Sequence, residues 1–235
     1  MTDEVLPIRE QGSQRQQLPE EVATYVREMI ISGAVRPGDF LRTEPIAEAV
    51  GVSNTPVREG LLALRSQGFV QLVPRRGFVV ASFTRQDVRD LFWAQAQLAG
   101  ELAARAARKM TPELADQLEA NLAAYEKALA DGDEDGVARL GYSFHRLINL
   151  AAGSHRLALL LGSMARHLPK RFYATIEGRA AETRDEHPLL VEALRQRDPR
   201  KARTRMEKHI LGGADHLVEI LEQRGLWASD SEPVS

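Results

Sequence analysis

Residues 51–70, GVSNTPVREGLLALRSQGFV, begin with a short polar turn and continue as an apolar helix. The apolar residues after the turn recur at helical spacing and predict one buried face, formed by Leu61, Leu62, Leu64 and Phe69. Four polar residues stand at the exposed start of the same helix: Ser53, Asn54, Thr55 and Arg58. A helix that is buried on one side and polar at its exposed N-terminal end is a candidate for binding a partner molecule through that end.

The segments on either side of this stretch complete a recognisable pattern. Apolar residues from Leu18 to Ile30 predict a first helix, which the glycines and proline of residues 33–38 end. A second helix is predicted from Thr43 to Gly51 and a third from about 54 to 68. Two β-rich runs, 69–73 and 78–83, then flank a turn at 74–77 and predict a hairpin. Three helices followed by a hairpin predict a winged helix-turn-helix.

The rest of the chain has helical patterns throughout. Helices are predicted at about 84–107, from Thr111 to the break at 131–136, and at 134–152, 155–177, 183–197 and 199–224. The fold class is therefore mainly α, with a winged helix-turn-helix domain at residues 17–82 and an all-helical, antiparallel bundle at 83–227. Polar segments at 1–16 and 228–235 are expected to be flexible tails.

Composition narrows the class of protein. The chain has 235 residues, of which 43% are hydrophobic and 27% charged, as in soluble globular proteins. No apolar run is long enough to span a bilayer and no signal region is visible, so a cytoplasmic protein without membrane partners is expected. Without cysteine, any metal must be bound by His, Asp or Glu. The net charge is −2, yet residues 53–80 contain four arginines and one acid, which favours a local nucleic-acid surface.

The polar start of the third helix has the chemistry for reading double-stranded DNA. In a helix-turn-helix the N-terminal residues of this helix meet base edges in the major groove. Asn54 has the amide geometry to bind adenine, while Ser53 and Thr55 can donate to phosphates and Arg58 can reach a phosphate or guanine. The hairpin tip would contact the adjacent minor groove or backbone through Arg75, Arg76 and Gly77. The alternative is that Ser53 is only a helix cap and the arginines are a solvated surface.

Three histidines lie on or beside apolar faces of different predicted helices. His145 shares its face with Gly141, His187 with Leu190, and His209 with Met206. If all three point into one core, they form a neutral imidazole cluster that suits zinc, nickel or a similar divalent ion. Separately hydrogen-bonded core histidines explain the same spacing.

The N-terminal part resembles the DNA-binding domain of the GntR family of bacterial transcription regulators. The segments SGAVRPGDFL, IAEAVGVS, TPVRE and RRGFVV fall in family order within residues 18–80. The resemblance implies DNA contacts at Arg42, Ser53, Asn54, Thr55, Arg58 and Gly77. Asn54 stands where the family usually has arginine, which predicts an operator preference moved toward adenine.

Residues 84 to about 224 resemble FCD, the helical ligand-binding domain of the FadR-type branch of this family. That domain commonly binds a metal through one Asp and three His, and the resemblance assigns the histidines to His145, His187 and His209. The Asp position is Gly141 here, so one ligand and its negative charge are missing. An arginine that can pair with an acidic effector is replaced by Gln95. Either another cation such as Arg171 takes this role, or the effector is not a simple organic acid.

These features predict a homodimeric DNA-binding regulator, acting as a repressor, whose operator affinity depends on a small-molecule effector. Two alternatives remain at this point. A metal-dependent hydrolase would use the three histidines, although neither a His-Glu-x-x-His pattern nor a paired carboxylate is visible, and the chain is expected not to be an enzyme. A helical adaptor would use the winged domain for protein contacts and would show no salt-dependent DNA affinity.

Overall fold

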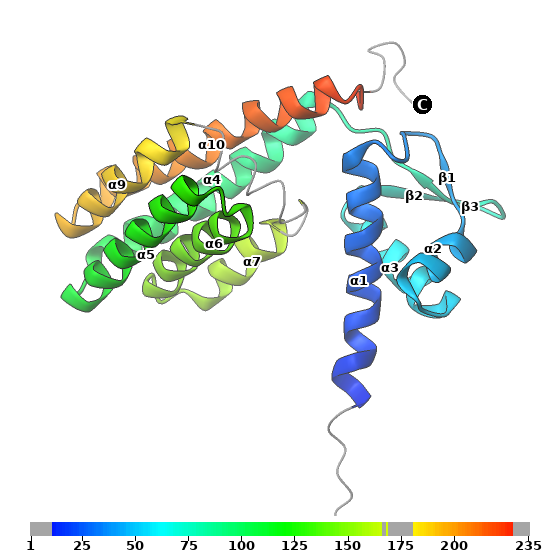
Figure 1. Cartoon of the computed structure of the whole chain (residues 1–235), viewed down its shortest axis with the longest axis horizontal. Helices are drawn as coiled ribbons and strands as arrows, with labels where there is room; N and C mark the ends of the chain where they lie inside the picture. The colour runs from blue at the N-terminus through cyan, green and yellow to red at the C-terminus, as the bar shows by residue number, and fades with distance from the viewer. Residues whose placement is uncertain (1–10, 166–167, 169–180, 228–235) are drawn as a thin grey trace, which may run out of the picture. The chain divides into compact units, whose positions relative to one another are not determined.

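A computed structural model of the chain describes residues 11–165, 168 and 181–227 (Figure 1). The chain divides into two compact units. Of the described residues, the first unit contains 11–83 and 224–227, and the second contains those between Thr84 and Gln223. Within the described ranges, no helix is long and apolar enough to cross a membrane.

The first unit is a winged helix-turn-helix. Its elements follow the order α1 (Gln11–Ser32), β1 (Phe40–Leu41), α2 (Thr43–Val50), α3 (Asn54–Ser66), β2 (Val70–Val73) and β3 (Gly77–Val80). The strands form an antiparallel sheet in the order β1-β3-β2. The turn between α2 and α3 depends on Gly51, whose φ of 75° ends α2 in the left-handed conformation that glycine adopts without strain. The predicted mainly helical fold with a winged domain is confirmed.

The core of this unit explains how α3 is held with its start exposed. Val57, Leu61 and Leu64 lie on the buried face of α3 and pack with apolar residues of α1 and of the sheet. Gly60 lets α1 and α3 approach closely, because a Cβ atom there would lie 2.7 Å from the carbonyl oxygen of Pro19. Leu62, which was expected in the core, is 47% exposed and belongs to the outer face of α3.

Three other sequence expectations for this unit need correction. The polar tail was expected to extend to residue 16, but α1 already begins at Gln11 and passes through Pro19. The two-residue strand β1 was not predicted. The hairpin strands are shorter than the apolar runs, since β2 begins at Val70 and β3 ends at Val80.

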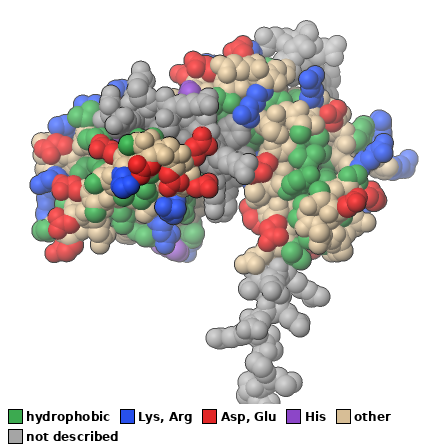
Figure 2. Space-filling view, in the orientation of Figure 1, with side chains coloured by type: hydrophobic (Ala, Val, Ile, Leu, Met, Phe, Trp, Pro, Cys, Tyr) green, Lys and Arg blue, Asp and Glu red, His purple; other side chains and the backbone are tan. Residues whose placement is uncertain are grey.

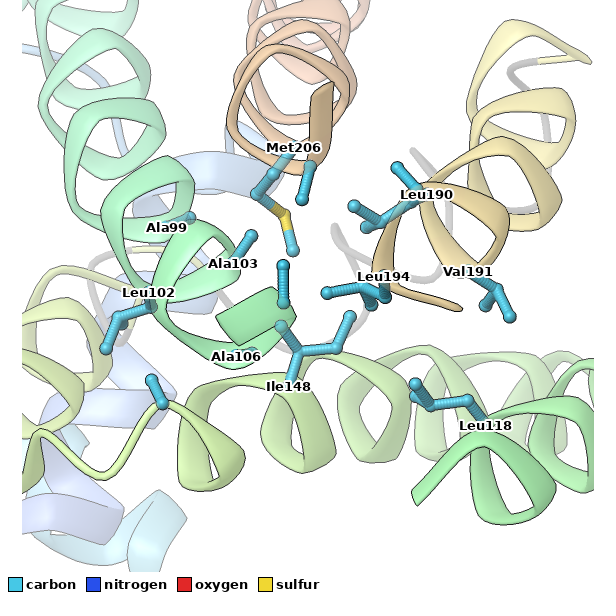
Figure 3. Close-up of a cluster of buried hydrophobic side chains, with 14 of the residues drawn as sticks. Ala99, Leu102, Ala103, Ala106, Leu118, Ile148, Leu190, Val191, Leu194 and Met206 are labelled. Atoms are coloured by element: carbon cyan, nitrogen blue, oxygen red, sulfur yellow. The ribbon is translucent and has the colours of Figure 1, made fainter. Parts of the chain in front are cut away.

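In its described residues, the second unit is built from helices, as predicted. It contains α4 (Arg85–Arg108), α5 (Pro112–Asp131), α6 (Glu134–Ala151), α7 (His155–Ala165), α9 (Ala181–Arg195) and α10 (Pro199–Gln223). The start of α4 is fixed by a capping box, in which Thr84 and Asp87 each bond the other's backbone N–H. Figure 3 shows the core, where small residues of α4 such as Ala99 and Ala103 face Met206 of α10, and Ile148 of α6 lies below them. The small side chains allow α4 and α10 to pack closely along their length.

The C-terminal boundary differs from the prediction. Residues up to 227 were assigned to the helical domain, but the chain from Arg224 belongs to the winged-helix unit. Leu226, in this segment, is buried, and Trp227 packs edge-on against Phe83 with ring centres 5.7 Å apart. The winged-helix unit is therefore built from both ends of the described chain.

Candidate DNA-binding surface and histidine cluster

Basic side chains from several segments line one concave surface of the winged-helix unit. Arg42 lies between β1 and α2, Arg58 lies on α3, and Arg75 and Arg76 form the turn between β2 and β3. Gly77 lines the same surface. Figure 2 shows blue side chains at the edge of the view where Figure 1 places the tip of the β2–β3 hairpin. The fold thus gathers the predicted arginines, which are distant in the sequence, onto one surface.

The N-terminal end of α3 leaves its polar side chains available. Ser53, Asn54 and Thr55 are all exposed. Ser53 has the extended backbone of an N-cap residue, but its hydroxyl makes no capping hydrogen bond. The unbonded N–H groups and positive dipole of a helix N-terminus favour an anion such as phosphate. This geometry weakens the alternative in which Ser53 serves only as a cap.

The hairpin tip is held in a specific backbone conformation. Arg75 has a φ of 64° and Gly77 a φ of 100°, so both lie in the left-handed region. Arg76 places its guanidinium carbon 4.7 Å from the centre of the Phe40 ring, a distance at which a cation is attracted to an aromatic face. The Phe40 ring restricts the positions of the Arg76 side chain, while its guanidinium group remains at the surface.

The three histidines come from three helices and meet at one point. His145 lies on α6, His187 on α9 and His209 on α10. The Nε2 atom of His209 is 3.0 Å from Nε2 of His145 and 3.4 Å from Nε2 of His187. His187 and His209 are buried, with 1% and 6% of their surfaces exposed. Of the alternatives left open by the sequence, the structure favours one cluster over separately placed histidines.

Burial favours the neutral form of two rings of the cluster, His187 and His209. Burial, followed by the charge of His145, lowers the pKa of His187 to about 3. Burial is also the main cause that lowers the pKa of His209 well below its usual value. Phe144 and Tyr125 flank the His187 ring, with centroid distances of 4.4 and 5.5 Å. Neutral imidazole is the form that binds a metal.

The nitrogen atoms fit a divalent metal. A tetrahedral zinc ion with nitrogen ligands at about 2.0–2.1 Å would place neighbouring nitrogens about 3.3 Å apart. The separations of His209 Nε2 from the other two rings are close to this value, and the ligand atoms of all three histidines lie within 4.8 Å of one another. The three histidines together form one group that could hold a single metal ion. The Nδ1 atoms of His187 and His209 are buried and have no hydrogen-bond partner among the described residues. Within the part of the chain that the structure describes, no carboxylate or carbonyl group takes the role of orienting these two rings.

The other predicted effector residues have different positions. Gly141 is buried on α6, one turn before His145, and supplies no ligand atom. Gln95 is buried on α4. Arg171 lies outside the described residues. The sequence therefore placed two neutral residues in the interior of the helical unit, where the family resemblance expects charged ones.

A buried acid beside the cluster was not predicted from the sequence. Glu186 precedes His187 and is 5% exposed. Its carboxylate lies 3.3 Å from Arg205 Nη1 and 2.5 Å from Lys208 Nζ, both on α10. These ion pairs join α9 to α10 next to the two buried histidines. The available signal was an acid directly before a histidine on an amphipathic helix, followed by a basic stretch at 200–208.

Known proteins share both parts of this architecture. Residues 18–80 match the family described as bacterial regulatory proteins, gntR family, and residues 90–212 match the FCD domain. The chain is 28% identical over 204 residues to the uncharacterized HTH-type transcriptional regulator YdhC of Bacillus subtilis, covering 84% of this chain and 90% of that protein. It is 22% identical to the HTH-type transcriptional repressor RspR of Escherichia coli, covering 96% and 100% of the two chains.

A solved structure shows the same fold. Escherichia coli McbR/YncC superposes with a TM-score of 0.62 at 23% identity, covering 88% of this chain and 98% of that one. The family matches begin at the first apolar turn of α1 and extend through most of α10, so they include both the basic surface and the three histidines. The chain belongs to the gntR family of bacterial transcriptional regulators, with an FCD effector-binding domain after its winged helix-turn-helix.

Proposed function

We propose that this regulator binds a palindromic operator as a homodimer and represses transcription, with its operator affinity set by an effector in the FCD domain. The observation that carries the proposal is the convergence of four arginines on one surface beside the exposed start of α3. The positive charge is concentrated on this surface and does not reflect the chain as a whole, whose net charge is −2. A relative named as a repressor, RspR, supports the direction of regulation.

The groups on this surface have separate tasks in the proposed complex. Asn54, at the tip of α3, would bond the major-groove edge of adenine through its amide. Ser53 and Thr55 would donate to phosphates next to the helix N-terminus. The arginines would neutralise phosphates, with Arg58 on the helix side and Arg75 and Arg76 on the hairpin side. Two such surfaces in a homodimer would meet the two halves of a palindrome.

The DNA part is tested by measuring affinity against salt concentration. Each phosphate that the protein neutralises contributes about 0.9 to the slope of log K against log salt. Arg58→Ala should therefore lower the affinity severely and reduce the slope by about 0.9. Arg139→Ala, an exposed arginine on α6, is the matched control and should leave both values unchanged. Equal losses in the two variants would contradict the proposed surface.

In the helical domain, the histidine cluster is the proposed effector centre. A bound zinc or nickel ion would offer open coordination positions to an effector oxygen, because the three nitrogens fill only part of its coordination sphere. Gly141 leaves the usual Asp position without a ligand, so water or an effector carboxylate would occupy that place. Gln95 cannot form a charge-assisted pair with a carboxylate. Arg171 is the cation proposed to take that part.

Effector binding would act through the helices that carry the cluster. His145, His187 and His209 lie on α6, α9 and α10, so a ligand shared among them stabilises one packing of these helices over others. A ligand changes an equilibrium only through such differential binding. The proposed result is a change in operator affinity that depends on occupancy of the cluster.

Metal titration tests this second part. Zinc or nickel added to chelator-treated protein should bind with a stoichiometry of one per chain, measured by calorimetry. His187→Asn should weaken this binding strongly, because it removes one of three nitrogen ligands. His155→Asn is the control, since His155 is exposed and outside the cluster. Equal metal affinity in both variants would contradict the assignment and leave the DNA-binding proposal intact.

A further inference from the structure

A short segment at the C-terminal end of the described chain is built into the winged-helix unit. We call Arg224–Trp227 the C-terminal clasp. It follows α10 directly, yet belongs with residues 11–83. Arg224 Nη1 donates to the carbonyl oxygen of Ile31 at 3.1 Å. Leu226 is 1% exposed, and Trp227 meets the Phe83 ring edge-on.

The contacts of the clasp are those of an integral part of the unit. Ile31 lies in the last turn of α1, where carbonyl oxygens have no partner within the helix, so Arg224 satisfies one of them. Leu226 packs against the chain reversal after α1: a Cβ atom on Gly33 would lie 3.4 Å from Leu226 Cδ2. The buried Leu226 side chain and the contact of the Trp227 and Phe83 rings remove apolar surface from water. The clasp is therefore held by both a polar and an apolar contact.

The clasp gives the winged-helix unit two covalent connections to the helical unit. The chain leaves the winged-helix unit at Phe83 to begin α4, and it returns at Arg224 from the end of α10. Near these ends, α4 and α10 are joined by ion pairs between Arg85 and Glu222 at 2.7 Å and between Arg89 and Asp215 at 3.3 Å. The helix that returns to the winged-helix unit is also the helix that carries His209.

We propose that the C-terminal clasp is the attachment through which a displacement of α10 reaches the DNA-binding unit. Residues 81–84 contain no helix or strand and form the other connection. A single covalent connection constrains the position of a domain but leaves its rotation largely free. Two connections restrict both the position and the rotation. The regulatory role of the clasp rests on the function proposed above. Its role as a second attachment does not.

Tryptophan fluorescence tests whether the clasp is docked. The chain has two tryptophans, Trp93 and Trp227, so Trp93→Phe leaves Trp227 as the reporter. In this background the emission should be blue-shifted and protected from a soluble quencher. Leu226→Ala should shift the emission to the red and expose the indole, while the control Leu211→Ala on α10 should not. A solvent-like emission from Trp227 in the Trp93→Phe chain would overturn the docking.

Spin labels test whether the clasp restricts the winged-helix unit. The chain lacks cysteine, so Glu21→Cys and Glu126→Cys introduce one exposed label site in each unit. Labelled chains are diluted with unlabelled chains to isolate distances within one chain. Combining Leu226→Ala with Trp227→Ala should broaden the distance distribution, and Leu211→Ala should leave it unchanged. Equal widths in all three proteins would overturn the proposal. Should the double variant lose helical circular dichroism, Arg224→Ala is measured in the same way.

The consequence for regulation is measured separately. Where zinc changes the operator affinity of the parent protein, the factor should lie within about 5–150-fold, the usual range for coupling between two sites. In the double variant of Leu226 and Trp227 this factor should fall toward one, which means that zinc no longer changes the affinity. The variant should bind zinc as the parent does, because the three histidines are untouched. Full retention of the zinc effect despite a broadened distribution would overturn the regulatory role. The spin-label result needs neither DNA nor metal, so a failure of the proposed function would not be mistaken for a failure of the clasp.

Discussion

Acidification should destabilise the metal-free protein through its buried histidine cluster. His187 has an ordinary pKa of 6.5, which burial lowers to about 3 in the folded chain. Between these two values the unfolded chain binds a proton that the folded chain does not. Stability from the neutral ring is therefore fully present above about pH 6.5 and is lost as the pH falls toward 3.

The size of the effect follows from the two pKa values. Integrating the proton difference from pH 7 to pH 5 gives a loss of about 2 kcal/mol for His187 alone. The full difference of the two pKa values corresponds to about 5 kcal/mol, reached only near pH 3. For a protein with a typical stability of about 5–15 kcal/mol, the loss by pH 5 is easily measured. His209, whose pKa is also lowered, should add to the loss in the same direction.

The assay is urea unfolding of chelator-treated protein at pH 7 and pH 5. The parent should lose about 2 kcal/mol more between these pH values than His187→Asn. The variant is less stable overall because it loses ring packing against Phe144, but its pH dependence should be flatter. His155→Asn, at an exposed position, should follow the parent. If the parent and His187→Asn lose the same free energy, the buried neutral histidine is not the cause.

Three substitutions test other parts of the account. Gly60→Ala places a Cβ atom 2.7 Å from the Pro19 carbonyl oxygen and should destabilise the winged-helix unit by about 1–3 kcal/mol. Thermal unfolding should show this as a lower midpoint temperature, and an unchanged midpoint would contradict the close approach of α1 and α3. Gly141→Asp adds a carboxylate one turn before His145 and should tighten zinc binding about tenfold. Calorimetry measures this affinity, and an unchanged value would place position 141 outside the metal site. Asn54→Arg should move the preferred operator base from adenine to guanine by about 1–3 kcal/mol in competition binding, and an unchanged preference would remove Asn54 from base reading.

The winged-helix fold was predictable because its signals are local. Gly51 and the apolar spacing of α3 determine a turn and a buried face within a few residues of each other. The early start of α1 was not predictable from periodicity, since residues 11–17 are polar and carry no apolar repeat. The strand β1 has only two residues and is defined by its partner β3, not by its own composition. Leu62 shows the same limit, because an apolar side chain on a helix can still face water.

The histidine site was partly predictable. Helical spacing placed His145, His187 and His209 on apolar faces, but no pattern within one helix determines that Nε2 atoms of three helices come within 3.0–3.4 Å. Glu186 was missed because its partners lie on α10, and the meaning of its charge depends on that packing.

The C-terminal clasp was assigned to the wrong domain for a similar reason. Arg224 and Ile31 are separated by 193 positions in the chain. A contact over such a distance leaves no trace in local spacing. The sequence therefore indicated the elements and many of the functional residues, while the packing of distant helices decided which of them meet.

Recovery of bound DNA tests directly whether the basic surface and the start of α3 read an operator. Fragmented DNA from the host is incubated with the purified full chain at physiological salt, and the fragments that stay bound are sequenced. We expect a few discrete sites that share a palindrome with adenine at the positions read by Asn54, and none with Arg58→Ala. Diffuse, salt-sensitive binding without a shared palindrome, even with added zinc or nickel, would contradict the claim that this surface reads an operator.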